Sequence, residues 1–158
     1  MTAVTPATEA LEASGIVFQL TEHGPVRSLE EAAAARGLEP WRIIKTIVVR
    51  RGEGDFLFVL VPGDREISWP KLRSELGVSR LSMPDKDVAR AVTGYERGTI
   101  TPLGSTTAWP VYVDERIAGR RVSMGAGEHG VSLFVDADAL IAGLGATVAD
   151  ISEAAPER

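Results

Sequence analysis

A single lysine inside a β-branched run is the residue whose type and position most clearly indicate chemistry. Residues 43–49 read Ile-Ile-Lys-Thr-Ile-Val-Val, and β-branched side chains favour a buried strand over a helix. Side chains alternate along a strand, so Lys45 shares its face with Ile43, Ile47 and Val49. Its ammonium either extends to solvent at the strand end or points into a cavity that offers an anionic or carbonyl-bearing group. Arginine greatly outnumbers lysine in this chain, which favours a site that needs a compact ammonium.

Two glycine-rich segments, residues 94–105 and 125–130, are further candidates for a ligand site. Glycine lets the backbone approach a ligand closely and aim N–H groups at an anion or a carbonyl oxygen. Neither segment contains the G-x-x-x-x-G-K-[ST] pattern of a phosphate-binding loop. Gly125, Gly127 and Gly130 have the spacing of a dinucleotide-binding fingerprint, but they precede a predicted strand instead of a helix, so we reject that interpretation. Simple connection between elements is the alternative for both segments.

No side chain has the sequence context of an activated nucleophile. The serines lie outside any G-x-S-x-G motif, and His23 and His129 lie in predicted turns, where a solvated imidazole is the simpler interpretation. Asp85 and Asp87 lie at the start of a predicted helix. The helix dipole favours acidic residues there, so their presence needs no catalytic role. Catalysis would therefore depend on positioning and on backbone donors, with water or a group of the substrate as the attacking species.

Composition and charge limit the classes of function. The chain has 158 residues, 44% of them hydrophobic, which suits one domain over residues 1–158. A net charge of −5 argues against a general nucleic-acid coat but allows a protein that handles only the end of a nucleic acid. Arg42 and the pairs at 50–51 and 120–121 could form a small phosphate patch, although such charges more often form a solvated face.

Cysteine is absent and histidine occurs twice, so disulfides and thiolate zinc sites are excluded and no metal site is expected. The longest apolar runs are far shorter than the ~20 residues of a membrane span, and the first residues lack the pattern of a signal peptide. We therefore expect a cytoplasmic protein that does not enter a membrane. The sequence does not indicate an oligomeric state.

Helix caps and apolar runs predict an α+β domain. Thr5-Pro6 and Ser28-x-x-Glu31 are helix-start signals, and Ser82 is a plausible cap for a helix that ends before Gly94. The predicted helices are 6–14, 29–36, 69–76, 83–93 and 137–143. The predicted strands are 16–20, 43–49, 56–61, 111–114, 120–124, 131–135 and 146–151. Residues 21–25 are expected to form a turn, strands 43–49 and 56–61 a hairpin, and residues 152–158 a frayed tail.

Five segments of the chain resemble, in order, the YbaK family. They are residues 21–23, 44–49, 93–104, 127–130 and 149–151, and the most specific are the lysine strand and the Gly98-x-x-x-Pro102 loop. This family contains free-standing relatives of the editing domain that is inserted in bacterial prolyl-tRNA synthetase. The resemblance implies a mixed, largely antiparallel, barrel-like sheet flanked by helices. It also implies an aminoacyl-tRNA deacylase, which hydrolyses the ester joining a wrong amino acid to tRNA without any cofactor.

The resemblance implies roles for particular residues. Lys45 and Gly98 would be catalytic, with Lys45 in the pocket and loop amides near the ester carbonyl. Further residues would contact the substrate: Thr21, Thr46, Thr99, Ile100, Thr101, Pro102, Gly104, Gly127, Gly130 and Ser132. The partner would be an aminoacyl-tRNA, held at its acceptor end, with prolyl-tRNA synthetase as a further candidate. A non-catalytic module that binds aminoacyl-tRNA ends, a nucleotide or a synthetase is the alternative, and a small-molecule esterase is disfavoured because no nucleophile is present.

Two positions depart from the pattern of family members that remove cysteine from tRNA-Pro. Those members commonly have Tyr before the Glu-His pair and Asp in the strand after the second glycine segment, where this chain has Thr21 and Ser132. Both changes alter the size and polarity of a pocket wall. Cysteine is therefore doubtful as the substrate, and alanine, serine, threonine or a non-protein amino acid is open.

Overall fold

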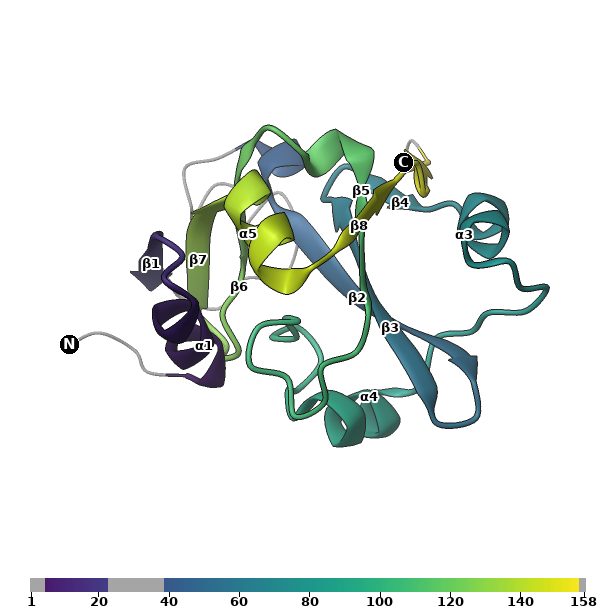
Figure 1. Cartoon of the computed structure of the whole chain (residues 1–158), viewed down its shortest axis with the longest axis horizontal. Coiled ribbons are helices and arrows are strands. Elements are labelled where there is room, and N and C mark those ends of the chain that lie inside the picture. Colours follow the sequence, from purple (N-terminus) through teal and green to yellow (C-terminus); the bar gives the residue numbers. More distant parts are fainter. Residues whose placement is uncertain (1–4, 23–38, 157–158) are drawn as a thin grey trace.

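The fold is an α+β arrangement of three sheets with short helices around them (Figure 1). The computed structural model describes residues 5–22 and 39–156. The predicted helix 29–36 and His23 lie outside the described residues. Two of the three sheets are antiparallel throughout and the third is mixed, which confirms the prediction of a mixed, largely antiparallel α+β fold.

The lysine strand belongs to the four-stranded sheet. β2 (Ile44–Gly52) and β3 (Asp55–Pro62) form the predicted antiparallel hairpin, and β5 (Val111–Asp114) and β8 (Thr147–Ala149) extend it in parallel. The order is β2-β3-β5-β8, so β2 lies at one edge of this sheet.

The other two sheets lie on either side of this one. β1 (Phe18–Glu22), β7 (Val131–Asp136) and β6 (Arg121–Gly125) form an antiparallel sheet in the order β1-β7-β6. β4 (Arg65–Ile67) pairs with β9 (Ser152–Ala154). Just before β2, residue 43 forms a bridge with residue 123 of β6, so the edge of the large sheet continues into the second sheet.

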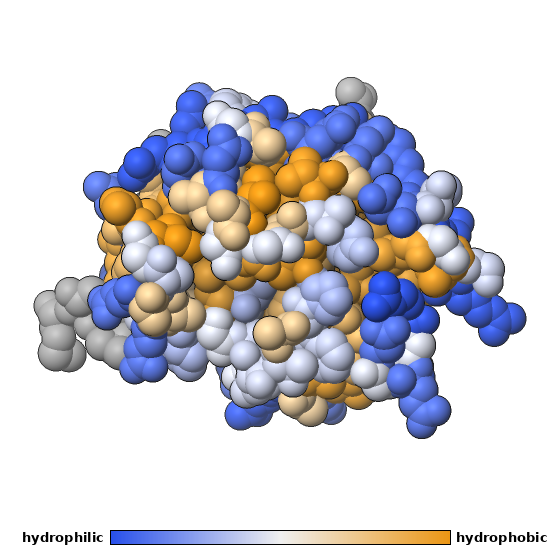
Figure 2. All heavy atoms as spheres, viewed as in Figure 1, coloured by the Kyte–Doolittle hydropathy of each residue, from blue (hydrophilic) through white to orange (hydrophobic). Residues whose placement is uncertain are grey.

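β3 separates two hydrophobic clusters and is buried on both faces. Phe56, Phe58 and Leu60 face the larger cluster, whereas Leu57 and Val59 face the smaller one. Burial of both faces explains why this strand is a continuous apolar run and does not alternate with polar residues. Figure 2 shows hydrophobic residues at the centre of one face of the molecule and hydrophilic residues around its margin.

The helices begin largely where the cap signals predict. They are α1 (Pro6–Ser14), α3 (Trp69–Leu76), α4 (Lys86–Thr93) and α5 (Ala137–Leu144), with short 3-10 turns η1 (Pro40–Arg42) and η2 (Glu115–Ile117). The prediction that Ser82 caps α4 is wrong. Asp85 caps it by accepting the Val88 N–H at 2.9 Å, while Ser82 exchanges backbone hydrogen bonds with Arg50.

Two further predictions are corrected at the ends of elements. β1 begins two residues later than expected, so Thr21 lies in a strand and not in a turn. The expected frayed tail from residue 152 begins instead with β9, in which Ser152 is fully buried. Pairing with β4, far away in the sequence, orders this polar segment.

We predict that Gly104 is needed for stability because α1 packs against it. Its φ is +69°, and a Cβ there would meet the Pro6 carbonyl and lie 2.9 Å from the Ala7 nitrogen. Gly104→Ala should lower the free energy of unfolding by about 2–5 kcal/mol through backbone strain and overpacking. Gly145→Ala is the matched control, because Gly145 has a φ of +61° but open space around it, and about 1–2 kcal/mol is expected. Equal losses in urea denaturation would show that the packing of Gly104 is unimportant.

Candidate active site

A cavity of about 620 Å³ lies along β2 and brings the predicted catalytic segments together. β2 contributes Lys45 and Thr46, and the long glycine-rich loop contributes Gly98 and Ile100. Gly125, at the end of β6, closes one side, and the start of α4 closes another. Segments as far apart in the sequence as Ile44 and Gly125 therefore meet in one hollow.

Lys45 is half-buried, and its ammonium has a carbonyl partner. Nζ donates a hydrogen bond to the backbone carbonyl of Arg65. Of the two possibilities for this lysine, a cavity with a carbonyl-bearing partner therefore describes it better than free extension into solvent. Burial lowers the pKa of Lys45 below 10.5, and the nearby carboxylates of Glu66 and Asp64 oppose that shift. An ammonium has three N–H donors, so donors remain for a ligand.

A brace from the C-terminal strand holds the segment that carries this carbonyl. The Arg65 guanidinium donates to Ser152 Oγ at 2.7 Å and to the Ser152 carbonyl at 3.1 Å. The Lys71 ammonium also donates to the Ser152 carbonyl, at 3.1 Å. These contacts join β4 to β9 and fix the position of the acceptor beside Lys45.

The loop that carries Gly98 is held from inside. The Tyr95 hydroxyl donates to the Leu103 carbonyl at 2.6 Å, which closes the loop, and burial raises the pKa of Tyr95 to about 12. The Thr99 amide and hydroxyl both donate to the Glu96 carbonyl, at 2.9 and 2.8 Å. A phenol whose pKa is raised this far stays protonated and keeps donating at neutral pH.

Gly98 lies exposed at the tip of this loop, with a φ of +92° that favours glycine. Among the described residues, the backbone amides of Gly98 and Ile100 have no hydrogen-bond acceptor. Both residues line the cavity. These amides can therefore donate to an oxyanion or a carbonyl oxygen inside it.

The structure gives several other predicted contact residues a place in the loop. Thr99, Thr101 and Pro102 are buried, and the Thr101 hydroxyl accepts the Leu103 N–H at 3.3 Å. Unlike Gly98 and Ile100, these residues and Gly104 are not among those that line the cavity. The geometry shows them shaping the loop.

The second glycine segment packs against the first. A Cβ at Gly127 would lie 2.6 Å from the Tyr95 ring, and one at Gly98 would lie 3.4 Å from Cε1 of His129. His129 Nε2 lies 3.4 Å from a carboxylate oxygen of Glu96, with both side chains more than half exposed. Gly130, with a φ of +79°, leads into β7. The two predicted glycine segments are therefore neighbours.

Thr21 and Ser132, the two departures from the family pattern, lie directly opposite each other. Thr21 of β1 pairs with Ser132 of β7, and Ser132 pairs in turn with Gly125 of β6. Ser132 is buried, whereas Thr21 is exposed. Only Gly125 of this row lines the cavity, so the other two lie behind its wall.

Thr46 lines the cavity, but its hydroxyl is buried. The hydroxyl oxygen has no hydrogen-bond partner in the described part of the chain. Because neighbouring side chains of a strand point to opposite faces, Thr46 and Lys45 approach the hollow from different faces of β2. A buried hydroxyl without a partner is costly unless a ligand or water satisfies it.

Sequence reasoning missed the charged rim of the cavity. Asp85, Lys86 and Arg97 all line it. The only sequence signal was the charge of residues next to predicted turns, and the role of Asp85 was explained by the helix dipole. Their meeting depends on how α4 packs beside β2, which local sequence does not show.

A second hollow of about 550 Å³ gathers arginines from distant elements. Arg50, Arg51, Arg73 and Arg80 line it, and we call it the arginine hollow. Arg51 pairs with Asp55 at 2.9 Å, but the other arginines form no ion pair within the described structure. Ser82 of this hollow directly precedes Met83 at the rim of the active-site cavity.

The described residues give no sign of a metal centre. Within 5–22 and 39–156, His, Cys, Asp and Glu side chains nowhere gather in threes as metal ligands. No helix in this same part of the chain has the length and apolar composition needed to cross a membrane.

Comparison with known proteins agrees with this geometry. The sequence model of the aminoacyl-tRNA editing domain family matches residues 23–142. The chain belongs to this family. The family predicted from the sequence is confirmed, and with it the expectation of an enzyme that deacylates aminoacyl-tRNA.

Individual relatives of this editing domain include free-standing and inserted forms. An Enterococcus faecalis protein described as a candidate Cys-tRNA(Pro)/Cys-tRNA(Cys) deacylase, EbsC, is 28% identical over 115 residues, which cover 72% of this chain and 70% of that protein. A proline–tRNA ligase of Geobacter sp. strain M21 is 31% identical over 93 residues, or 59% of this chain but only 16% of the ligase. A crystal structure described as a candidate trans-editing enzyme for prolyl tRNA synthetase superposes with a TM-score of 0.86 at 29% identity, covering 96% and 99% of the two chains.

We predict that Glu66→Gln lowers the pKa of Lys45 further. The Glu66 carboxylate stabilises the charged ammonium, so its removal favours the neutral amine and moves the titration to lower pH. NMR of ε-carbon-labelled lysine measures this directly, because the chain has lysine only at positions 45, 71 and 86. Glu53→Gln, in the tip at the far end of the β2–β3 hairpin, should leave the titration unchanged. A wild-type pKa at or above 10.5 would contradict the described burial.

Proposed function

We propose that this editing domain acts in trans and hydrolyses the ester of a mischarged tRNA, with tRNA-Pro as the first candidate. One observation carries the proposal: Lys45, Gly98 and Ile100 line the same cavity, and the backbone amides of the last two have no acceptor within the described residues. A cation and backbone donors in one hollow suit an ester carbonyl that becomes an oxyanion. The cytoplasm, where charged tRNA is used, is the expected location.

The reaction needs no side-chain nucleophile. Water attacks the ester carbonyl, or a group of the amino acid attacks it and forms a cyclic product that water opens afterwards; the free hydroxyl of the terminal ribose can position the water. The loop amides near Gly98 stabilise the oxyanion, and Lys45 orients the substrate with its remaining N–H donors. The carbon–oxygen bond to the ribose then breaks, and the tRNA hydroxyl takes a proton. An aminoacyl ester is already activated, so positioning and charge stabilisation suffice.

The amino acid that is removed depends on a few groups at the wall of the cavity. Thr46 lines the cavity and has a buried hydroxyl without a hydrogen-bond partner in the described part of the chain, and Ser132 is the strand neighbour of Gly125. A wall of this kind suits a small side chain, and we propose alanine, serine or threonine ahead of cysteine. Apolar pockets discriminate single methylenes by only about 1–3 kcal/mol, so hydrogen bonding by the Thr46 hydroxyl would matter most.

We propose that the arginine hollow holds phosphates of the acceptor stem. It adjoins the rim of the cavity through residues 82 and 83, and most of its guanidinium groups have no carboxylate partner. Guanidinium groups bind phosphate bidentately. The chain has a net charge of −5, so a local cluster of arginines can direct an acidic RNA to one face.

A non-catalytic module that binds aminoacyl-tRNA ends or a synthetase, such as prolyl-tRNA synthetase, is the second candidate. The amides of Gly98 and Ile100, which have no acceptor among the described residues, would serve binding as well as catalysis. Turnover separates the two: an enzyme releases free amino acid when protein is sub-stoichiometric, whereas a binder only protects the ester.

We predict that Lys45→Ala reduces deacylation by roughly 100- to 1000-fold, the usual effect of removing one electrostatic contact to a transition state. The assay uses tRNA-Pro charged with Cys, Ala, Ser, Thr or Pro. Arg121→Ala is the control, since its exposed guanidinium stacks on Phe134, 4.8 Å from the ring centre and outside the cavity. Thermal melting establishes that both variants fold. Near-normal turnover by a folded Lys45→Ala protein would exclude the proposed mechanism, and no turnover by the wild type would favour the binding module.

We also predict that neutral substitutions in the arginine hollow reduce the salt dependence of tRNA binding. Each lost phosphate contact should lower the slope of log Kd against log salt by about 1. The Arg73→Gln/Arg80→Gln double variant should therefore bind uncharged tRNA more weakly and with a slope lower by about 2. Arg121→Gln serves as the control. A double variant with the wild-type slope would place the RNA elsewhere.

A further inference from the structure

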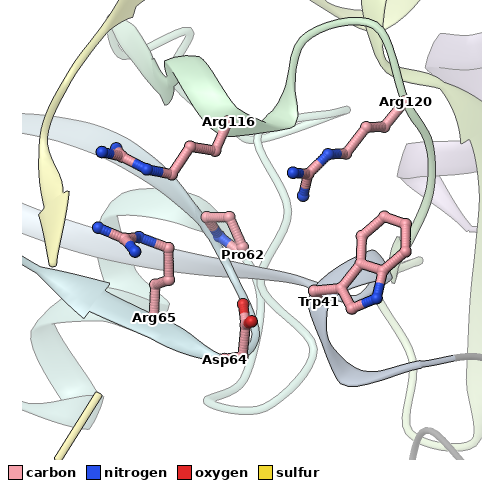
Figure 3. Close-up of a pocket in the computed structure, with 6 residues that line it drawn as sticks. All are labelled: Trp41, Pro62, Asp64, Arg65, Arg116 and Arg120. Carbon is pink, nitrogen blue, oxygen red and sulfur yellow. The ribbon is translucent and has the colours of Figure 1, made fainter. Parts of the chain in front are cut away.

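A third cavity, of about 410 Å³, lies beside the start of β2 and has no part in the sites described above. It is lined by Trp41, Pro62, Asp64, Arg65, Arg116 and Arg120 (Figure 3). We call it the Trp41 pocket. Its residues come from η1, from the connection of β3 to β4, and from η2 and the segment that follows it.

The Trp41 pocket adjoins the active site through Lys45. The Lys45 ammonium donates to the carbonyl of Arg65, whose side chain lines the Trp41 pocket. Trp41 itself precedes Lys45 by only one short turn and the beginning of β2. One lysine–carbonyl contact therefore connects the lining of the two hollows.

Two of the three guanidinium groups here have no carboxylate partner. Arg116 is neutralised by Asp114 at 3.2 Å and by Asp150 at 2.8 Å. Arg65 donates only to the hydroxyl and the carbonyl of Ser152, which are neutral. Arg120 forms no ion pair within the described residues. A hollow with two uncompensated cations is suited to an anion.

Arg120 is also held in an orientation that suits an anion. Its guanidinium lies 4.7 Å from the centre of the Trp41 ring (Figure 3). Stacking occupies the faces of a guanidinium and leaves the N–H donors at its edge available for bidentate hydrogen bonds to an oxyanion. Arg42 lies 4.6 Å from the centre of the same ring and pairs with Glu39, so its charge is already balanced.

Asp64 is the one acidic side chain that lines the pocket, and its charge acts on a different group. It forms no ion pair with the arginines of the pocket. It does raise the pKa of Lys45, so it lies close enough to compensate that ammonium. Asp64 offsets part of the positive charge of the pocket, whose three arginines still outnumber its one carboxylate.

We propose that Arg65 and Arg120 bind a phosphate group in the Trp41 pocket, and that this phosphate belongs to the RNA strand whose end occupies the active site. This assignment of the RNA as the source rests on the proposed function. Phosphate suits the site because a guanidinium presents paired donors that match its oxygens. A free mononucleotide carries the same chemistry and is the other source to be tested.

The test compares two neighbouring arginines that both stack on an aromatic ring. Arg120→Gln removes a charge from the pocket, and Arg121→Gln removes one from outside it. Binding of uncharged tRNA by the intact chain is measured by fluorescence anisotropy. We expect Arg120→Gln to weaken binding about tenfold, as loss of a hydrogen bond to a charged group does, and Arg121→Gln to leave it unchanged. Equal affinities for the wild type and folded Arg120→Gln would overturn the proposal.

Two further measurements separate the sources and the proposed function. Adenosine monophosphate is titrated while the indole N–H signals of the three tryptophans are followed by NMR. A saturable shift of the Trp41 signal together with unchanged tRNA binding by Arg120→Gln would overturn the RNA assignment. Hydrolysis of an aminoacylated adenosine, which lacks the strand, should be equal in wild type and Arg120→Gln. If the wild type hydrolyses no ester, the proposed function fails, and the tRNA-binding comparison still tests the pocket.

Discussion

The site depends on how a half-buried ammonium is kept hydrogen-bonded. Desolvation disfavours the charged form of Lys45, and the carbonyl of Arg65 together with the carboxylates of Glu66 and Asp64 offsets part of that cost. The acceptor is a backbone atom, so its position depends on the strand that carries it. That strand, β4, is only three residues long and is held by β9. The position of the Lys45 ammonium therefore depends on a small sheet at the periphery of the fold.

The loop around Gly98, which forms another wall of the cavity, is held in place by packing and by a side-chain hydrogen bond. The loop around Gly98 has no regular hydrogen-bond ladder, and a buried tyrosine hydroxyl closes it from within. The glycine at 127 allows the second loop to lie directly against that tyrosine ring. Two aperiodic segments thus fix each other, which leaves the amides at the tip exposed but ordered. Preorganised donors of this kind stabilise charge without reorganisation during reaction.

Sequence patterns predicted the elements that are determined locally. The β2–β3 hairpin follows from β-branched runs and a glycine tip, and α1 and α3 follow from their caps. The cap of α4 was misassigned because Ser82 and Asp85 are both good cap residues, and the pairing of Ser82 with Arg50 decides between them. The residues of β9, Ser-Glu-Ala, have no strand propensity of their own, and only pairing with β4 makes them a strand.

The site was predictable only where residue type alone marks a residue as unusual. The unusual lysine and the glycine loops were visible in the chain, and they do share a cavity. The acceptor of Lys45 was not, because a backbone carbonyl leaves no signature in residue type. The gathering of Arg50 with Arg80, and of Trp41 with Arg120, likewise depends on tertiary packing. In the structure Gly104 packs against the start of α1 and Thr101 accepts a hydrogen bond within the loop, and their contact with substrate stays a prediction.

The brace from β9 also has a consequence for the order in which the protein matures. Lys45 and the Gly98 loop leave the ribosome early. Ser152, which anchors Arg65, lies 87 positions after Arg65 in the sequence. Until that segment has emerged and paired, the carbonyl beside the lysine has no fixed place. A nascent chain that has formed its hairpin and its loops, but not the β4–β9 pair, would therefore lack the fixed acceptor beside Lys45. The segment that fixes this part of the cavity is synthesised well after the segments that line it.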